Sequence, residues 1–184
     1  MTFNFIPFKK IPRLSRDMVI TEKLDGTNAS IHITEDGEFI TCSRNRVITP
    51  GDDNYGFSKW AHENKEELMK LGVGSHFGEW WGQGVQRGYG LTEKRFSLFR
   101  KVNGVEYPSC VSFVPVLYRG KFDTRVIENE VIALSVAGSM AVPGFMEPEG
   151  VVVYHEASGQ LFKKTCKDDG ISKSEADFLH KNKS

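Results

Sequence analysis

The sequence predicts an α+β domain in which antiparallel sheets are flanked by a few helices. Three observations support this fold class. The chain has 184 residues, of which 39% are hydrophobic and 26% charged, the size and apolar content of one ordinary domain with its own core. Short strand-like runs follow one another through turns, as they do in antiparallel sheets. Two stretches in the body of the chain have the apolar spacing of a helix.

Local signals place the elements along the chain. Ile31, Ile33 and Phe39 alternate across an Asp-Gly turn in the manner of a hairpin. Gly72 and Gly138 end the two helical patterns. In chain order, the predicted elements are a strand at 19–23, hairpin strands at 29–34 and 38–44, a loop at 49–56, a helix at 57–71, strands at 75–81, 95–102 and 110–118, a helix at 126–137, strands at 149–155 and 160–166, and a tail helix at 172–181 that opens with a capping box.

Charge, cysteine content and hydropathy exclude several classes of protein. The formal net charge is +0, which argues against a polybasic binder but leaves local cationic pockets open. Cys42, Cys110 and Cys166 are odd in number and far apart, so we expect neither a disulfide framework nor a structural zinc site. This cysteine usage predicts a reducing, cytoplasmic location. With short apolar runs only, we expect no signal peptide and no membrane partner.

Lys23 lies in the string Thr21-Glu22-Lys23-Leu24-Asp25-Gly26-Thr27-Asn28, where a strand ends in a tight turn. A lysine in such a place can stand at the floor of a cleft, and the glycine lets a substrate approach the backbone. A lysine amine is a nucleophile only when neutral, and its reference pKa of about 10.4 makes that form scarce at neutral pH. A nucleophilic Lys23 therefore predicts positive charges nearby. On its own, the octapeptide suits an exposed lysine beside a hairpin equally well.

Three further blocks contain residues that suit a nucleotide site. Arg44 and Arg46 project to one face of a strand, where they suit phosphate or ribose oxygens as well as an edge protected by charge. Glu79 lies in an aromatic strand, and a buried carboxylate is rarely left without a donor. Phe99 alternates with Leu98 and suits either stacking on a base or the core.

The last two blocks are Glu149-Gly150-Val151, which opens a buried strand, and Leu161–Lys167, in which Lys163 and Lys164 point to opposite faces. Taken alone, the second of these is better interpreted as a solvated lysine cluster. The glycines between 82 and 90 come close to a dinucleotide fingerprint, but the spacing is one residue too long and opens no helix. We therefore interpret that segment as a flexible or tightly turned loop.

In this order, the six blocks resemble the covalent nucleotidyltransferase superfamily of RNA ligases, DNA ligases and mRNA capping enzymes. The string EKLDGTN is most similar to the ATP-dependent RNA ligase family of phage type, and the resemblance spans roughly residues 18–167. It implies an ATP-grasp-like nucleotidyltransferase domain. We expect residues 1–184 to form this single adenylation domain, without an OB-fold or a C-terminal ligase domain.

The resemblance also implies a role for each matching residue. Lys23 would attack the α-phosphate of ATP, forming a lysine–AMP phosphoramidate and expelling pyrophosphate. Glu149 would associate with a divalent metal, Mg²⁺ or Mn²⁺. The other implied contacts are Glu22 to adenine, Asp25 and Gly26 to the pocket wall, Asn28 to the nucleic-acid end, Arg44 to ribose or the 5′-phosphate, Glu79 to the ribose hydroxyls, Phe99 stacked on adenine, Lys163 to the α-phosphate, and Lys164 as a further cofactor contact.

The leading functional hypothesis is an ATP-dependent RNA ligase that joins 5′-phosphate and 3′-OH ends of RNA, including those at a nicked duplex. The chain departs from the family where Thr165 replaces a second lysine and Arg100 follows Phe99 in place of an aspartate. Self-adenylation depends least on these departures. A minimal DNA ligase, a 5′-adenylating enzyme and a catalytically silent nucleotide- or nucleic-acid-binding protein remain alternatives. The candidates for local phosphate contacts are Lys9, Lys10, Arg13, Arg16, Arg44, Arg46, Lys94, Arg95, Arg100 and Lys101. A protein partner that supplies the remaining affinity for nucleic acid is a further alternative.

Overall fold

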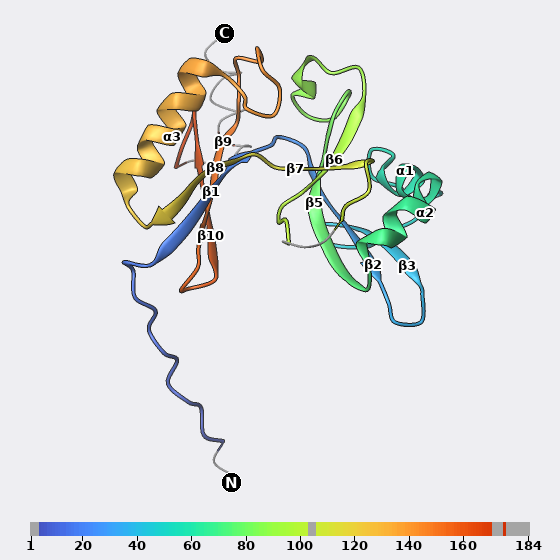
Figure 1. Ribbon diagram of the computed structural model, residues 1–184, viewed down its shortest axis with the longest axis horizontal. Helices are drawn as coiled ribbons and strands as arrows, with labels where there is room; N and C mark the ends of the chain where they lie inside the picture. The colour runs from blue at the N-terminus through green and yellow to red at the C-terminus, as the bar shows by residue number, and fades with distance from the viewer. Residues whose placement is uncertain (1–3, 103–105, 171–174, 176–184) are drawn as a thin grey trace.

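Two β-sheets with helices on their outer sides make up the computed structural model, which describes residues 4–102, 106–170 and 175 (Figure 1). One sheet has four strands and the other six. The helices lie outside the pair of sheets, so that the inner faces are turned toward each other. This arrangement confirms the predicted α+β class. The predicted tail helix at 172–181 lies outside the described residues, apart from residue 175.

The four-stranded sheet is antiparallel throughout and carries one helix. Its order is β10 (Gln160–Thr165), β9 (Gly150–His155), β1 (Asp17–Lys23) and β8 (Val116–Lys121). Helix α3 (Thr124–Ala137) covers the outer face. Along β1, burial alternates, so Met18 and Ile20 pack against Leu134 of α3, while Lys23 ends the strand on the opposite face.

The six-stranded sheet holds the larger core. Its order is β4 (Val47–Ile48), β3 (Phe39–Ser43), β2 (Thr27–Ile33), β5 (Gly74–Gly82), β6 (Lys94–Leu98) and β7 (Val111–Phe113), and the only parallel pair among them is β6 with β7. Helices α1 (Phe57–Glu63) and α2 (Lys65–Leu68) and the 3-10 turn η1 (Met69–Leu71) cover its outer face. There Trp80 and Phe96 pack against Phe57, leaving the alternate positions to the inner face.

The helix predicted over 57–71 is broken at Asn64. This residue has φ −106° and ψ 17°, and its side-chain amide donates to the carbonyl of Trp60. An asparagine side chain competes with the backbone for such carbonyls, which disfavours the interior of a helix. The apolar face is nevertheless kept across the break, because Ala61 and Leu68 both reach the same core. Gly72 ends the segment as predicted, with φ 79°.

The strand predicted over 110–118 is two strands in different sheets. β7 pairs with β6, and β8 pairs with β1. Pro115 lies between them, and a proline cannot donate to a ladder, so pairing stops there. The carbonyl of Pro115 instead accepts a hydrogen bond of 2.9 Å from the amide of Glu22. The strand predicted over 95–102 likewise ends at Leu98, after which the amide of Phe99 still bonds to Phe77.

Two segments carry the chain between the sheets. Leu24 to Gly26 joins β1 to β2, and Val114-Pro115 joins β7 to β8. Leu24 and Val114 are buried together with Trp81 and Tyr89 in a small apolar cluster between the sheets. None of the described helices combines the length and the apolar character that a membrane crossing requires. The crossing after β1 places the Lys23 turn where both sheets meet.

Candidate active site

Lys23 and Glu149 face each other at the inner ends of β1 and β9. The Lys23 amine donates a hydrogen bond of 2.7 Å to Oε2 of Glu149. The two side chains are 24% and 10% exposed, so the pair is largely withdrawn from water. The antiparallel register puts Lys23 opposite Gly150, which directly follows Glu149. The strand pairing therefore fixes the amine beside this carboxylate.

Glu79 and Asn28 extend the cluster onto the six-stranded sheet. They are register partners on β5 and β2, and the Asn28 amide donates to Oε2 of Glu79 at 3.1 Å. Burial raises the pKa of Glu79 to about 7, and the negative charge of Glu149 adds to this rise. The Lys23 charge and hydrogen bonds from the Gly26 amide and Asn28 oppose it. Two acids and one amine from both sheets thus share one electrostatic environment.

The raised pKa of Glu79 predicts a stability that depends on pH. Between its usual 4.5 and about 7, the folded protein holds a proton that the unfolded chain has released. The contribution of Glu79 is therefore fully present below about pH 4.5 and is lost as the pH rises through about 7, amounting to up to about 3 kcal/mol. We expect Glu79→Gln to remove this part of the pH dependence. Urea unfolding of both proteins in metal-free buffer, repeated at pH values across this range, measures the free energy of unfolding as a function of pH. The same pH dependence in both proteins would contradict the prediction.

The turn after Lys23 is held by two residues that the sequence analysis did not single out. Arg87 donates to Oδ2 of Asp25 at 2.8 Å and to the carbonyl of Glu147 at 2.8 Å. The hydroxyl of Tyr89 accepts a hydrogen bond of 2.8 Å from the Asp25 amide, and burial raises the pKa of Tyr89. Arg87 thereby ties the Asp25 turn to the segment that ends at Glu149. The segment from 82 to 90 is tightly turned and contains the 3-10 turn η2 (Gly88–Gly90). The single basic residue in this glycine-rich segment, Arg87, was the sequence signal for its contact with an acid.

Gly26 packs against β5 so closely that a side chain has no room. A Cβ there would meet the carbonyl oxygen of Trp80 and lie 2.7 Å from Cβ of Trp81. We expect Gly26→Ala to cost about 1–3 kcal/mol, because β5 cannot shift without disturbing its ladder with β2. The expected fall in melting temperature is about 5 °C. Calorimetry measures it against Gly51→Ala, where a Cβ meets nothing within 4 Å; equal melting temperatures for the two variants would contradict the close packing.

Phe99 and Lys163 lie on the inner faces, and Arg44 is at a strand end. Phe99 is 43% exposed and bonds through its amide to Phe77, two residues before Glu79.

Lys163 lies on the same sheet face as Lys23, two strands away and at about 10 Å. The register shows this, because Lys163 pairs with Val152 and Val152 pairs with Thr21. The positive charge predicted near Lys23 is therefore on the same face, but the amine's direct contact is an acid. Arg44 follows β3 and is exposed.

Two predicted residues are not brought to this cluster. The Glu22 side chain faces the opposite side of β1, is 1% exposed, and accepts hydrogen bonds from the Ser139 hydroxyl and the amides of Met140 and Ala141 at 2.6–2.9 Å. These contacts occupy its carboxylate away from the inner face. Lys164 likewise points to the outer face, where its amine pairs with two carboxylates, those of Glu128 and Asp169.

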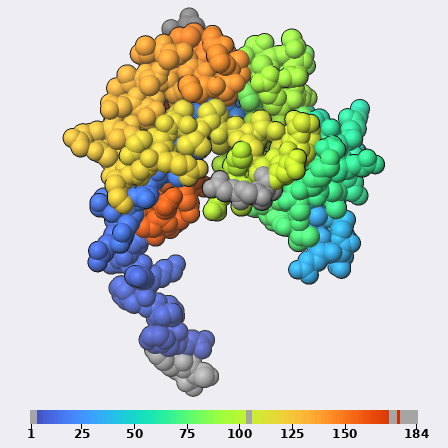
Figure 2. Space-filling view, viewed as in Figure 1, coloured from blue at the N-terminus to red at the C-terminus, as the bar shows by residue number. Residues whose placement is uncertain are grey.

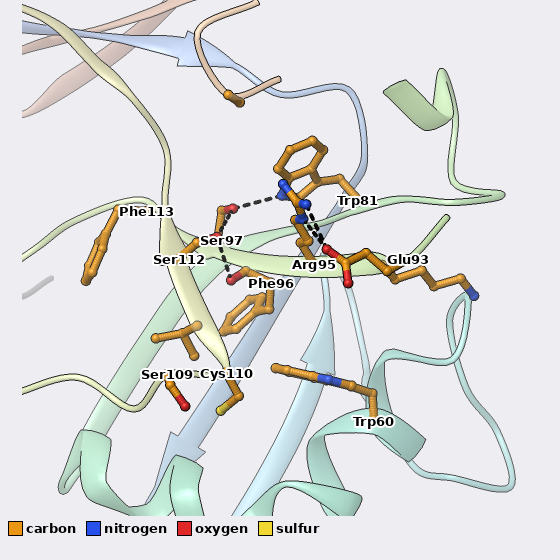
Figure 3. Close-up of a pocket in the computed structure, with 13 residues that line it drawn as sticks. Trp60, Trp81, Glu93, Arg95, Phe96, Ser97, Ser109, Cys110, Ser112 and Phe113 are labelled. Atoms are coloured by element: carbon orange, nitrogen blue, oxygen red, sulfur yellow. Dashed lines mark hydrogen bonds and ion pairs between the residues drawn. The ribbon is translucent and has the colours of Figure 1, made fainter. Parts of the chain in front are cut away.

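A separate cavity of about 390 Å³ lies beside the cluster, at the edge formed by β6 and β7 (Figure 3). Trp81 and Ser97 line it and are joined by a hydrogen bond of 2.8 Å from the indole nitrogen to the hydroxyl. Ser97 is the register partner of Glu79. Figure 3 shows Arg95 over Trp81, bonded to Glu93. The cavity therefore adjoins the cluster through Trp81 and Ser97, and neither Lys23 nor Glu149 lines it.

The sequence that builds this geometry matches a known protein family. The sequence model of the RNA ligase family matches residues 16–167, which include the strands of both sheets. The chain belongs to the RNA ligase family. The match contains Lys23, Glu79 and Glu149, so the residues that converge in space lie within the family region. Among curated protein sequences, none matches the chain significantly.

Solved structures resemble this RNA ligase family member in fold. A ligand-free mutant of Naegleria gruberi RNA ligase has a TM-score of 0.59 at 21% identity, covering 92% of this chain and 52% of that one. A mutant of the same enzyme with ATP and Mn has a TM-score of 0.59 at 20% identity, covering 93% and 53%, and one with AMP and Mn has 0.57 at 20%, covering 92% and 53%. The chain spans about half the length of these structures.

Proposed function

We propose that this chain is an ATP-dependent RNA ligase that uses Lys23 as a covalent carrier of AMP. The enzyme would take AMP from ATP, pass it to the 5′-phosphate of an RNA end, and seal that end to a 3′-OH with release of AMP. The observation that carries this proposal is the pairing of Lys23 with Glu149 at 2.7 Å, in one cluster with Glu79 from the other sheet. Membership in the RNA ligase family supports the choice of RNA ends as substrate.

The first step requires an amine that loses a proton. The neutral Lys23 amine attacks the α-phosphorus of ATP; a nitrogen–phosphorus bond forms as the bond to the pyrophosphate oxygen breaks, and pyrophosphate leaves. Glu149 is in hydrogen-bond contact with the amine and is placed to accept its proton. The route of the proton is short because the amine and the carboxylate are 2.7 Å apart, and it is defined because the pair is largely withdrawn from water.

The other inner-face residues suit the rest of the nucleotide. Glu79, held by Asn28, presents a buried carboxylate that ribose hydroxyls would satisfy. Phe99 has an exposed ring on the same sheet and would stack on the adenine. Lys163 would approach the phosphates from the other sheet, and exposed Arg44 is available to a phosphate or a ribose. In this proposal, Glu22 and Lys164 stabilise the fold and do not contact the nucleotide.

The acids at the site fit a divalent metal that arrives with the nucleotide. No group of three or more acidic, histidine or cysteine side chains is gathered for a metal in the described part of the chain. Magnesium commonly binds through one or two carboxylates together with substrate phosphates and water. Glu149 would supply such a ligand, and the mutual repulsion of Glu149 and Glu79 is relieved by a cation. Bound Mg²⁺ or Mn²⁺ would offset the charge of the phosphate oxygens.

Labelling with α-phosphate-labelled ATP tests the proposal. The protein is expected to carry the label through denaturing electrophoresis, and added 5′-phosphorylated RNA should discharge it. Nicked RNA, single-stranded RNA and nicked DNA, compared at equal concentration, separate an RNA ligase from a minimal DNA ligase. Transfer of AMP to RNA without sealing would identify a 5′-adenylating enzyme. Bound ATP without label under varied metal and pH would favour the silent binding protein and overturn the proposal.

We further propose that the two sheets work together as one adenylation domain. The supporting observation is that Lys23 and Glu149 come from one sheet and Glu79 and Asn28 from the other. Adenylation without efficient sealing is the second candidate function. It is favoured by Thr165, which lies in line with Lys23 across Gly150 and brings no second cation to that place.

A further inference from the structure

The segment from Asn4 to Arg16 is an extended arm that projects from the body of the molecule (Figures 1 and 2). Every residue in it is exposed. Its carbonyls at Leu14 and Arg16 are anchored by the ring of His155 and the amide of Phe122, each at 2.8 Å. Within the described part of the chain, residues 4–13 make no hydrogen bond, ion pair or ring contact with other residues. As far as the described residues show, the arm is therefore held at its base, and its exposed side chains are open to a ligand.

The charge of the arm indicates a polyanion. Residues 4–16 contain four cationic side chains and no acid, in a chain whose net charge is +0. Phosphate backbones bind such segments through release of counterions, one for each phosphate neutralised. The four cations are Lys9, Lys10, Arg13 and Arg16, and three of them lie beyond the anchored base of the arm.

The apolar residues of the arm suit exposed bases. Phe5 is 75% exposed and Phe8 97%, so both rings are open to a ligand. In this arm the two aromatic residues precede the cations. Exposed aromatic rings next to cationic side chains are the combination that binds single-stranded nucleic acid without sequence preference. Pro7 and Pro12 restrict the backbone, which lowers the entropy lost when the arm becomes ordered on a ligand.

We infer that the arm is a binding element for single-stranded RNA that contacts the substrate at a distance from the reacting end. The inference rests on the proposed function, because it takes RNA as the substrate. β1 joins the base of the arm to Lys23 and is about 20 Å long. An RNA that runs alongside β1 with about 3.4 Å per stacked nucleotide meets the arm about six nucleotides from its reacting end. The arm itself reaches up to about 40 Å when extended.

The test compares two triple variants of the full chain with equal loss of charge. The arm variant is Lys9→Gln/Lys10→Gln/Arg13→Gln. The control is Lys59→Gln/Lys65→Gln/Lys70→Gln, which removes exposed lysines from the helices on the outer face of the six-stranded sheet. Fluorescence anisotropy measures binding of 5′-phosphorylated RNA of about 20 and about 5 nucleotides over a range of salt concentrations. Self-adenylation, which needs no RNA, is measured in parallel.

For the RNA of about 20 nucleotides, the arm variant is expected to bind about 10-fold or more weakly at about 0.1 M salt, with a salt dependence lowered by about 2 in log–log slope. The control variant and the RNA of about 5 nucleotides should be unaffected. Phe5→Ala/Phe8→Ala should also weaken binding of the longer RNA, without changing the salt slope. Equal weakening in the control, or equal weakening for the short RNA, would overturn the inference.

Unchanged RNA binding in the arm variants would also overturn it. Sedimentation analysis would then show whether Phe5→Ala/Phe8→Ala abolishes self-association, the result expected if the arm instead docks on a second copy of the chain. Failure of this inference is distinguishable from failure of the proposed function. In the first case the arm variants still become labelled with AMP, and in the second no variant does, whatever its affinity for RNA.

Discussion

Replacing Lys23 by arginine is expected to abolish covalent AMP labelling while leaving the fold intact. Arginine keeps a cation beside Glu149, whose side chain is 10% exposed and would otherwise be left without its partner. A guanidinium does not lose its proton in a protein and so cannot attack phosphorus. The initial rate of label incorporation should fall by about 10⁴-fold or more, as it does when an enzyme loses its nucleophile.

Two companion variants separate chemistry from folding. Lys23→Ala should also lose the label, but with an additional loss of stability of about 2 kcal/mol, because the Glu149 carboxylate loses its cation. Lys59→Arg changes an exposed residue of α1 and should label at the native rate. A Lys23→Arg protein that labels as fast as the native chain would refute the role of this amine.

Replacing Glu22 by alanine is expected to lower the free energy of unfolding by about 4 kcal/mol, more than the loss of the Lys23 amine or a clash at Gly26. The buried carboxylate accepts three hydrogen bonds, from the Ser139 hydroxyl and two backbone amides. Bonds to a charged acceptor contribute about 1.5–3 kcal/mol each, and the donors would be left unsatisfied in the interior. The segment they hold leads to Glu149, so AMP labelling should also weaken. Urea unfolding measures the stability, and the labelling assay measures the activity.

A smaller change at the same place and a control on α1 grade the effect. Ser139→Ala removes one donor and should cost about 1–2 kcal/mol. Glu63→Ala removes an exposed carboxylate at the end of α1 and should change stability by less than about 0.5 kcal/mol. A Glu22→Ala protein as stable as the Glu63→Ala control would show that the carboxylate does not hold this segment.

Most of the strands were predictable because alternation of apolar and polar residues is written into the sequence, as in β2, where Ile31 and Ile33 alternate with Ser30 and His32. The errors came from single residues whose effect depends on tertiary context. Asn64 breaks a helix whose apolar spacing continues past it. Pro115 ends one strand and starts another in a different sheet, a change of partner that local pattern does not encode.

The candidate site was predictable to the extent that its residues lie in recognisable strings. Lys23, Glu79 and Glu149 were singled out from the sequence, and the structure brings them together. The roles of residues that act through long-range contacts were not predictable. Arg87 bonds to Asp25 across 62 positions, and Ser139 bonds to Glu22 across 117, so neither pairing leaves a local signal.

The two segments that carry the chain between the sheets both start from the junction of the sheets (Figure 1), where the amide of Glu22, near the end of β1, donates a hydrogen bond to the carbonyl of Pro115. Lys23 directly follows this bond. When two rigid bodies rock about such a junction, displacement is least at the fulcrum and grows along each lever. Under the proposed function, the Lys23 amine and the Glu149 carboxylate would thus keep their spacing while the far rims of the sheets part to admit a long polymer.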